Sequence, residues 1–203
     1  MFVTFEGPEG AGKSTLIAAL AVEFEQHGRR VVRTREPGAT SFGTEVRRLL
    51  LEGDNLSAET ELFLFLADRA NHVQRTLLPA LREGAVVLCD RYADSTLVYQ
   101  GYGRGLDLAF LRRANEFATG GLRPDLTLLL DLDPEAGLAR LDSKDRLDRE
   151  PIEFHRRIRA GFLAETKLDP DRWILIDASA APDRVLAQAK EAILRQLSGE
   201  GGE

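Results

Sequence analysis

The start of the chain constrains the fold more than any other stretch. Residues 2–5 are a short apolar run, and the glycine-rich segment that follows reads Gly7-Pro8-Glu9-Gly10-Ala11-Gly12-Lys13-Ser14-Thr15. An apolar-periodic segment typical of a helix then begins at Leu16. A G-x-x-x-x-G-K-S loop between a strand and a helix is a P-loop, whose backbone N–H groups bind phosphate at the positive end of the helix. A glycine-rich turn without a ligand is the alternative, but the flanking segments favour a nucleoside triphosphate site.

Four further short apolar runs occur along the chain, at residues 30–33, 85–89, 126–130 and 173–176. Longer segments with helical spacing separate them, which is typical of a parallel sheet covered by helices on both faces. We therefore expect an α/β protein with the P-loop NTPase fold, built on a five-stranded parallel sheet as a single domain over residues 1–203. Such sheets bind ligands beyond the carboxyl ends of their strands, so the loops there should form the site.

Composition narrows the class of protein. The formal net charge of −6 argues against a surface that binds nucleic-acid backbones. A single cysteine excludes an internal disulfide, and no apolar run approaches the ~20 residues that span a membrane. Met1 leads directly into the first strand, which leaves no room for a signal peptide. We expect a cytoplasmic protein with no membrane or nucleic-acid partner.

The P-loop and the end of the third strand together indicate phosphoryl-transfer chemistry. Lys13 can reach the β- and γ-phosphates of a nucleotide, and the Ser14 hydroxyl can bind Mg²⁺. Asp90 ends the third strand, where its carboxylate can hold Mg²⁺ directly or through water. Arg91 can bridge two phosphate groups as charge redistributes between them. Taken alone, Asp90 and Arg91 are explained equally well as a surface ion pair.

Polar residues at helical spacing indicate a second binding region. Ser95, Thr96, Tyr99 and Gln100 would share one face of a short helix. Their hydroxyl and amide groups are of the kind that fix a polar small molecule. Glu9 is an acid inside an anion-binding loop, so it is expected to serve something other than the phosphates, such as a sugar hydroxyl. An ordinary solvated acid is the alternative.

A long helix is predicted over residues 55–81, entered at Ser57. Phe65 and Arg69 lie four residues apart on it, so Phe65 could stack on a base while Arg69 donates to a base carbonyl. A core phenylalanine and a solvated arginine are the alternative. Residues 62–67 (Leu-Phe-Leu-Phe-Leu-Ala) are apolar nearly all round, which suggests burial on two sides. We expect this stretch to contact the sheet with one face and a second subunit of a homodimer with the other.

Several stretches of the chain resemble the thymidylate kinases in their bacterial form. They are the P-loop segment, Thr34-Arg35-Glu36-Pro37-Gly38, Leu64-Phe65-Leu66-Ala67-Asp68-Arg69, Cys89-Asp90-Arg91-Tyr92-Ala93-Asp94-Ser95-Thr96-Leu97-Val98-Tyr99-Gln100-Gly101 and Arg123-Pro124-Asp125-Leu126-Thr127. They follow the family's order and cover the chain except for its last helix. The resemblance implies transfer of the γ-phosphoryl of ATP to dTMP, giving dTDP for dTTP synthesis, with Mg²⁺ and in a homodimer.

The resemblance also implies roles for individual residues. Phe65 would stack on thymine, and Arg69 and Gln100 would hydrogen-bond it. Glu9 would face the deoxyribose 3′-hydroxyl, and Tyr99 would occupy the place of a ribose 2′-hydroxyl. The other residues implied to bind dTMP are Arg47 and Arg91 at its phosphate, and Glu36, Pro37, Ser95 and Thr96 along the pocket.

The charged segment at residues 143–150 (Ser-Lys-Asp-Arg-Leu-Asp-Arg-Glu) is interpreted as part of a helical basic lid over about 140–152. Charge runs are usually solvated connections. The P-loop, however, supplies no arginine, and an arginine on the transferred phosphoryl group is worth about 10³–10⁵ in rate. The Arg-Leu-Asp-Arg pattern resembles the lid of the bacterial family. Arg146 and Arg149 are therefore the expected catalytic arginines, and Arg140 is expected nearer the adenine.

Other interpretations stay open. Another nucleoside monophosphate kinase or a deoxynucleoside kinase has similar topology, and Glu36 could serve the latter as base for a 5′-hydroxyl. A GTPase-type switch or a motor ATPase is less favoured because no Asn-Lys-x-Asp motif occurs. Cys89 and Trp173 are expected in the core, and the three histidines lack the neighbours of a zinc site. Asp131 and Asp133 follow the fourth strand without an assigned role.

Overall fold

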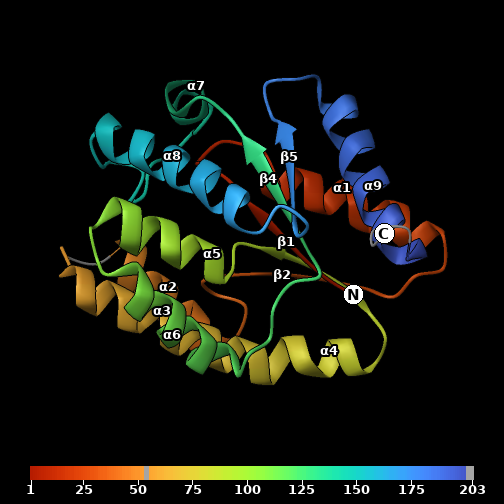
Figure 1. Cartoon of the computed structure of the whole chain (residues 1–203), viewed down its shortest axis with the longest axis horizontal. Coiled ribbons are helices and arrows are strands. Elements are labelled where there is room, and N and C mark those ends of the chain that lie inside the picture. The colour runs from red at the N-terminus through yellow and green to blue at the C-terminus, as the bar shows by residue number, and fades with distance from the viewer. Residues whose placement is uncertain (53–54, 200–203) are drawn as a thin grey trace.

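Five parallel strands form the sheet of the computed structural model, which describes residues 1–52 and 55–199. In space they lie in the order β2-β3-β1-β4-β5, with the P-loop strand in the centre (Figure 1). Their bounds are Phe2–Glu6 for β1, Val31–Arg35 for β2, Val86–Asp90 for β3, Leu126–Asp131 for β4 and Trp173–Asp177 for β5. The predicted five-stranded sheet is confirmed, and each strand ends within one or two residues of its predicted bounds.

Helices and two π-helical segments connect the strands. Their bounds are α1 Lys13–Gln26, α2 Ser41–Glu52, α3 Ala58–His72, η1 Val73–Leu77, α4 Leu78–Arg82, α5 Ala93–Thr96, η2 Leu97–Gly103, α6 Leu108–Thr119, α7 Pro134–Ala139, α8 Ile152–Leu168 and α9 Pro182–Ser198. Within the described ranges, none of these helices has the length and apolar character needed to cross a bilayer.

Successive side chains of the strands point to opposite faces of the sheet. Val3 and Phe5 of β1 pack with α1 and α9 in one buried cluster. On the other face, Phe2 packs with η1 and α4, and Leu129 of β4 packs with η2 and α8. Because helices cover both faces, the three inner strands β3, β1 and β4 are buried almost throughout, whereas the edge strands β2 and β5 are partly exposed.

The predicted long helix is present but consists of three segments, α3, η1 and α4. The Ser57 hydroxyl accepts a hydrogen bond from the Thr60 N–H at 3.2 Å, so the helix begins where its cap predicts. The expected contact of residues 62–67 with the sheet is wrong. Leu62 packs with Leu97 and Leu111 of η2 and α6, while η1 and α4 cover the sheet. The apolar run therefore belongs to a layer of helices, α2, α3 and α6, that lie side by side away from the sheet (Figure 1).

Candidate active site

The carboxyl ends of β1, β2 and β3 bring three polar segments to one edge of the sheet. Phe5 of β1 pairs with Asp90 of β3, which in turn pairs with Arg35 of β2. The backbone continues this arrangement, since the Glu36 N–H donates to the Asp90 carbonyl at 2.9 Å and the Arg91 N–H donates to the Phe5 carbonyl at 3.0 Å. The three segments therefore begin side by side, at the edge where parallel sheets bind their ligands.

The backbone of the P-loop requires glycine, as Gly12 and Gly10 show. Gly12, directly before α1, has φ 87°, a left-handed conformation that glycine adopts freely. A side chain at Gly10 would lie 2.0 Å from the Gly137 carbonyl oxygen, so the loop packs its backbone directly against α7.

Lys13 is folded back over its own loop. Its Nζ donates to the carbonyl oxygens of Gly7 at 3.0 Å and Pro8 at 2.8 Å. Burial, and then the neighbouring Arg91 cation, lower the pKa of Lys13 to about 8. A bound anion between the two cations would offset their repulsion, so the site as built favours a phosphate.

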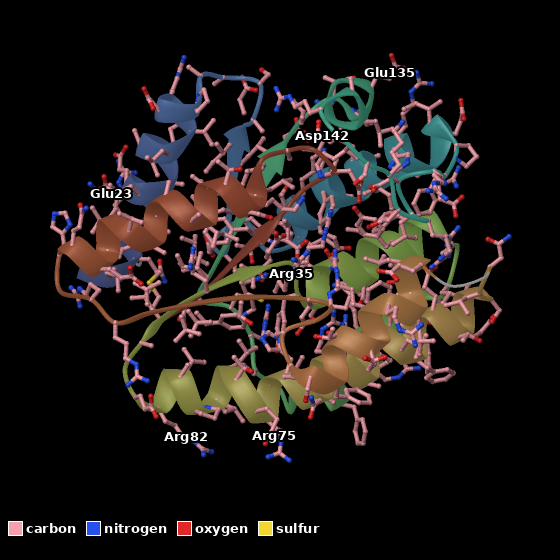
Figure 2. All side chains as sticks on the ribbon, turned by 180° about the vertical axis from the view of Figure 1, so that it is seen from behind. Glu23, Arg35, Arg75, Arg82, Glu135 and Asp142 are labelled. Atoms are coloured by element: carbon pink, nitrogen blue, oxygen red, sulfur yellow. The ribbon has the colours of Figure 1, made fainter. Side chains whose placement is uncertain are left out.

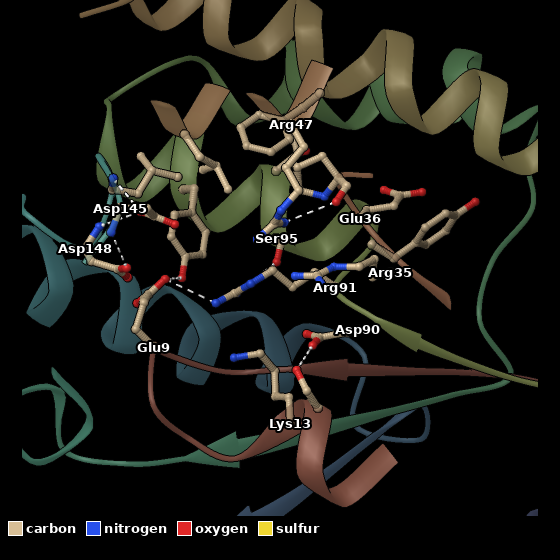
Figure 3. Close-up of a pocket in the computed structure, with 18 of the residues that line it drawn as sticks. Glu9, Lys13, Arg35, Glu36, Arg47, Asp90, Arg91, Ser95, Asp145 and Asp148 are labelled. Carbon is tan, nitrogen blue, oxygen red and sulfur yellow. Dashed lines mark hydrogen bonds and ion pairs between the residues drawn. The ribbon is translucent and has the colours of Figure 1, made fainter. Parts of the chain in front are cut away.

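Ser14 and Asp90 form a pair of hard oxygen donors beside Lys13. The Ser14 hydroxyl donates to Asp90 Oδ2 at 2.7 Å (Figure 3). Hydroxyl and carboxylate oxygens are ligands that suit Mg²⁺, which keeps several waters or phosphate oxygens besides. Among the described residues, no group of three or more His, Cys, Asp or Glu side chains could hold a metal. A Mg²⁺ ion at this pair would therefore take most of its ligands from nucleotide and water.

Arg91 occupies a strained position above the P-loop. It has φ 68°, a region that residues other than glycine rarely adopt and that recurs at functional sites. Its guanidinium donates to Glu9 Oε1 at 3.1 Å and to Ser95 Oγ at 3.3 Å, and its Cζ lies 5.0 Å from the centre of the Tyr99 ring. These contacts aim the cation into the space above Lys13 (Figure 3).

The Glu9 carboxylate contacts three side chains, those of Arg91, Tyr99 and His155. The Tyr99 hydroxyl donates to Glu9 Oε1, and His155 Nδ1 lies 3.5 Å from Oε2. Burial opposes ionisation of Glu9, but His155, Arg91 and Lys13 lower its pKa to about 2. Glu9 therefore contacts both Tyr99 and Arg91, and its expected role beside a sugar hydroxyl stays a prediction.

One cavity of about 200 Å³ joins these groups to the predicted base-binding residues. Lys13 and Ser14 of the P-loop line one end of this cavity, and Phe65 and Arg69 of α3 line the other. The predicted triphosphate site and the predicted base site therefore share one cavity. The predicted residues that line the cavity are Glu9, Gly10, Lys13, Ser14, Glu36, Pro37, Arg47, Phe65, Arg69, Asp90, Arg91, Ser95, Thr96, Tyr99 and Gln100.

Comparison with known proteins identifies the family. The sequence model for thymidylate kinase matches residues 5–189. The chain belongs to the thymidylate kinase family. A thymidylate kinase from Synechococcus sp. is 53% identical over 188 residues, which cover 93% of this chain and 91% of the relative. One from Thermomicrobium roseum is 50% identical, with 98% of this chain and 97% of the relative covered. The predicted nucleoside monophosphate kinase of this family is thereby confirmed.

A solved structure supports the same conclusion for the fold. The crystal structure of thymidylate kinase from Ehrlichia chaffeensis matches this chain with a TM-score of 0.80 and 33% sequence identity. The match covers 95% of this chain and 98% of the Ehrlichia chain. The predicted P-loop NTPase architecture is confirmed by this match together with the sheet order.

The base end of this thymidylate kinase cavity is built on a buried arginine. Arg69 is 1% exposed, and its Nε donates to Glu36 Oε2 at 2.8 Å. Its Nη1 donates to Thr96 and Asn115 at 2.8 and 2.7 Å, and its Nη2 donates to the Tyr92 carbonyl at 2.9 Å. Arginine has five N–H donors, so one on Nη2 is left for a ligand.

Glu36 is fixed by two partners. Besides Arg69, His72 Nδ1 lies 2.8 Å from Glu36 Oε1, and the other ring nitrogen of His72 lies 2.7 Å from Thr34 Oγ1. Both carboxylate oxygens are therefore occupied, and the side chain is 3% exposed. A carboxylate held in this way is poorly placed to remove a proton from a nucleoside 5′-hydroxyl, which disfavours the deoxynucleoside kinase alternative.

Three arginines approach the middle of the cavity. Arg35, Arg47 and Arg91 all line it and point toward the space between Lys13 and Glu36 (Figure 3). Burial and the neighbouring Arg35 lower the pKa of Arg47. Neighbouring cations repel one another, and a bound anion would relieve that repulsion, so this cluster favours an anionic ligand.

Arg35 was not among the predicted site residues, although it lies within the segment that resembles the family. Arg35 ends β2, and this position at the ligand-binding edge of the sheet could have predicted it as a site residue. By contrast, Arg75 and Arg82 project outward from η1 and α4 (Figure 2). Sequence reasoning also missed Asp145 and Asp148, which line the cavity from the lid segment, and His155, for which no local pattern exists.

The predicted catalytic arginines of the lid do not line the cavity. Arg146 donates through Nη2 to Glu61 Oε2 at 2.7 Å and through Nε to the Leu50 carbonyl at 2.8 Å. Arg149 is exposed and borders a separate hollow on the outer side of the lid, together with Lys144. The role of these two arginines stays a prediction, and it requires the segment to change position.

Arg140, Cys89, Trp173, Asp131 and Asp133 lie outside the cavity. Arg140 Nη1 lies 3.4 Å from the carbonyls of Gly10 and Ala178, beside the outer edge of the P-loop. Cys89 and Trp173 are buried in core clusters, as expected. Asp131 forms a two-point ion pair with Arg159 at 2.7 and 2.8 Å, and Asp133 caps α7.

Proposed function

We propose that this chain transfers the γ-phosphoryl of ATP to dTMP, giving dTDP and ADP, with Mg²⁺. The observation that supports this most is the single cavity that connects Lys13 of the P-loop to Phe65 and Arg69 of the helical layer. A protein that only binds or hydrolyses a triphosphate has no use for a second, base-sized end on the same cavity.

The donor end would use the P-loop. Its backbone amides and Lys13 would bind the phosphates of ATP, and Ser14 with Asp90 would hold Mg²⁺, which would supply positive charge to the phosphates. The P-loop residues assigned to ATP are Gly7, Pro8, Glu9, Gly10, Ala11, Gly12, Lys13, Ser14 and Thr15. Arg140, whose Nη1 lies 3.4 Å from the Gly10 carbonyl of the loop, would lie near the adenine.

The acceptor end would use the arginine cluster. Arg91 and Arg47 hold the dTMP phosphate, and Arg35 adds a third positive charge. No general base is required, because the acceptor phosphate is already ionised and the reaction needs positioning and charge stabilisation. Ser95 keeps Arg91 directed into the cavity through its 3.3 Å contact.

The sugar and base of dTMP would lie beyond the arginine cluster. Phe65 stacks on thymine, and the remaining Nη2 hydrogen of Arg69 donates to a base carbonyl. Glu9 accepts from the deoxyribose 3′-hydroxyl, and the Tyr99 ring fills the place of a ribose 2′-hydroxyl. Glu36, Pro37 and Thr96 complete the wall, Glu36 and Thr96 by holding Arg69.

The segment 140–152 would act as the lid. In the structure Arg146 is bound to Glu61 and Arg149 lies outside the cavity, so a closing movement of the lid would have to bring both side chains inward. Closure brings Arg146 and Arg149 to the transferred phosphoryl group, where they stabilise the charge that spreads over its oxygens.

The apolar face of the helical layer would join two subunits of a homodimer. The exposed apolar side chains on α2, α3 and α6 are Phe42, Leu49, Phe63, Phe110 and Phe117. They extend the contact predicted for residues 62–67 across all three helices, and apolar patches of this kind mark protein interfaces. We assign the enzyme to the cytoplasm on the sequence argument alone.

A coupled assay tests the function. ADP release should be measured with ATP and Mg²⁺ in the presence of dTMP, dUMP, UMP or thymidine, with and without EDTA. We expect turnover with dTMP, weaker turnover with dUMP, almost none with UMP or thymidine, and loss of activity with EDTA. Preferential turnover of thymidine would contradict the monophosphate acceptor site.

A further inference from the structure

Glu61 is a buried acid that none of the proposed roles uses. It lies in the first turn of α3 and is 1% exposed. Gln100 Nε2 donates to its Oε1 at 2.8 Å, and Arg146 Nη2 and Arg104 Nη2 donate to its Oε2 at 2.7 and 3.3 Å. Burial opposes ionisation of Glu61, but Arg146, Arg104 and Gln100 together lower its pKa, so the carboxylate is charged.

The charge on Glu61 determines which way the Gln100 amide points. An ionised carboxylate can only accept hydrogen bonds, whereas an amide has an N–H₂ end that donates and a carbonyl end that accepts. Gln100 must therefore turn its N–H₂ end toward Glu61, as the 2.8 Å contact records. The carbonyl Oε1 is then the end left for the cavity that Gln100 lines.

We infer that Glu61 is a positioning residue that fixes the Gln100 amide with its carbonyl toward the base and thereby selects a base that donates an N–H there. The inference rests on the proposed function. The N3–H of thymine can donate to the Gln100 carbonyl, and the neighbouring O4 carbonyl can accept from the remaining N–H of Arg69. Cytosine offers a ring-nitrogen acceptor and an amino donor at these places, so both contacts would be reversed.

A different role for Glu61 would leave base selection unchanged. The carboxylate also holds Arg104 and Arg146, and through Arg146 it anchors the lid. If this anchoring were its whole contribution, neutralising Glu61 would change turnover with every acceptor by the same factor. Base selectivity is therefore the readout that separates the two roles.

The test compares native enzyme with Glu61→Gln, using dTMP, dCMP and dTMP methylated at N3. A site built on hydrogen bonds rejects a mismatched analogue by roughly 10⁴, so we expect native kcat/KM to favour dTMP over dCMP by about that factor. In Glu61→Gln, whose amide can donate as well as accept, Gln100 can turn over. The preference for dTMP should then fall at least ~10-fold, and the penalty for N3-methylation should shrink, as expected for coupled groups.

Glu59→Gln is the matched control, because Glu59 is exposed in the same helical turn and carries the same charge change. It should leave both ratios unchanged. A Glu61→Gln enzyme with lower kcat but unaltered ratios would overturn the inference. If that variant does not fold, native enzyme still decides, since full activity with N3-methylated dTMP would show that no acceptor faces N3.

Binding measurements separate failure of this inference from failure of the proposed function. The same ratios can be measured as Kd values for dTMP, dCMP and N3-methylated dTMP without turnover. A native protein that binds dTMP selectively but transfers no phosphoryl group would contradict the function and support the inference. A protein that binds dTMP and dCMP equally would overturn the inference even if it were an active kinase.

Discussion

The base end of the cavity and the lid segment differ in how completely their charged groups are paired. Arg69 is 1% exposed and donates to Glu36, Thr96, Asn115 and a backbone carbonyl. Arg149 is exposed and lies outside the cavity. The first arginine is organised before any ligand binds, whereas the second must move to reach one. Recognition of dTMP should therefore depend on the base end, and the rate of transfer on the lid.

The largest effect is expected from the lid. Arg149→Ala should lower kcat by about 10³–10⁵, because it removes an arginine that would stabilise the transferred phosphoryl group. The Kd for dTMP should hardly change, because the acceptor residues lie elsewhere. Single-turnover kinetics and calorimetric titration with dTMP measure the two quantities separately.

Lys144→Ala provides the control for Arg149→Ala. Lys144 is an exposed cation in the same segment and borders the same outer hollow. Its removal should change kcat little, since an exposed lysine contributes mainly through screened charge. If the two variants lost equal activity, total lid charge and not a specific arginine would be responsible.

The base end should respond to mutation with a loss of stability. Arg69→Leu removes one of the two partners of the buried Glu36 carboxylate, so that only His72 still contacts it. Breaking a buried pair from one side costs about 3–5 kcal/mol, and urea unfolding should show a decrease of that size together with loss of dTMP binding. Arg75→Ala, on the exposed surface of η1 (Figure 2), should leave the unfolding free energy within about 0.5 kcal/mol of native. An equally stable Arg69→Leu protein would show that the network is not structural.

The contrast also explains what the sequence could predict. Asp90, Arg91 and the P-loop follow strands of a parallel sheet, so their shared edge was predictable from strand order and polarity alone. The partners of Arg69 were not, because Glu36 and Asn115 lie 33 and 46 residues away and no local pattern pairs them. The direction of Arg146 was also unpredictable, because its partner Glu61 lies 85 residues away and no local pattern pairs them.

A smaller effect should come from the buried pair of His155 and Glu9. Burial would lower the pKa of His155, but the Glu9 carboxylate raises it. A histidine with a raised pKa contributes stability that is fully present below its unfolded value of ~6.5 and is lost as pH rises through the folded value. The unfolding free energy of native protein should therefore fall as the pH rises above ~6.5 and through the raised pKa of His155, and His155→Gln should remove that slope. His27→Gln, at an exposed histidine, should keep it; a slope that survives in His155→Gln would place its origin elsewhere.

The smallest effect on activity is expected at the apolar face of α2, α3 and α6. Phe63, on α3, is 61% exposed, and Phe63→Asp should convert a sedimenting dimer to a monomer, because a carboxylate would be buried in an apolar interface. Activity should stay within about twofold of native, since Phe63 does not line the cavity and surface changes cost about 0.5 kcal/mol. Val22→Asp, at an exposed apolar residue of α1 on the opposite side of the sheet, should remain dimeric. A Phe63→Asp protein that sediments as a dimer would show that this face is not the interface. A monomeric and inactive Phe63→Asp protein would show that the active site depends on the second subunit.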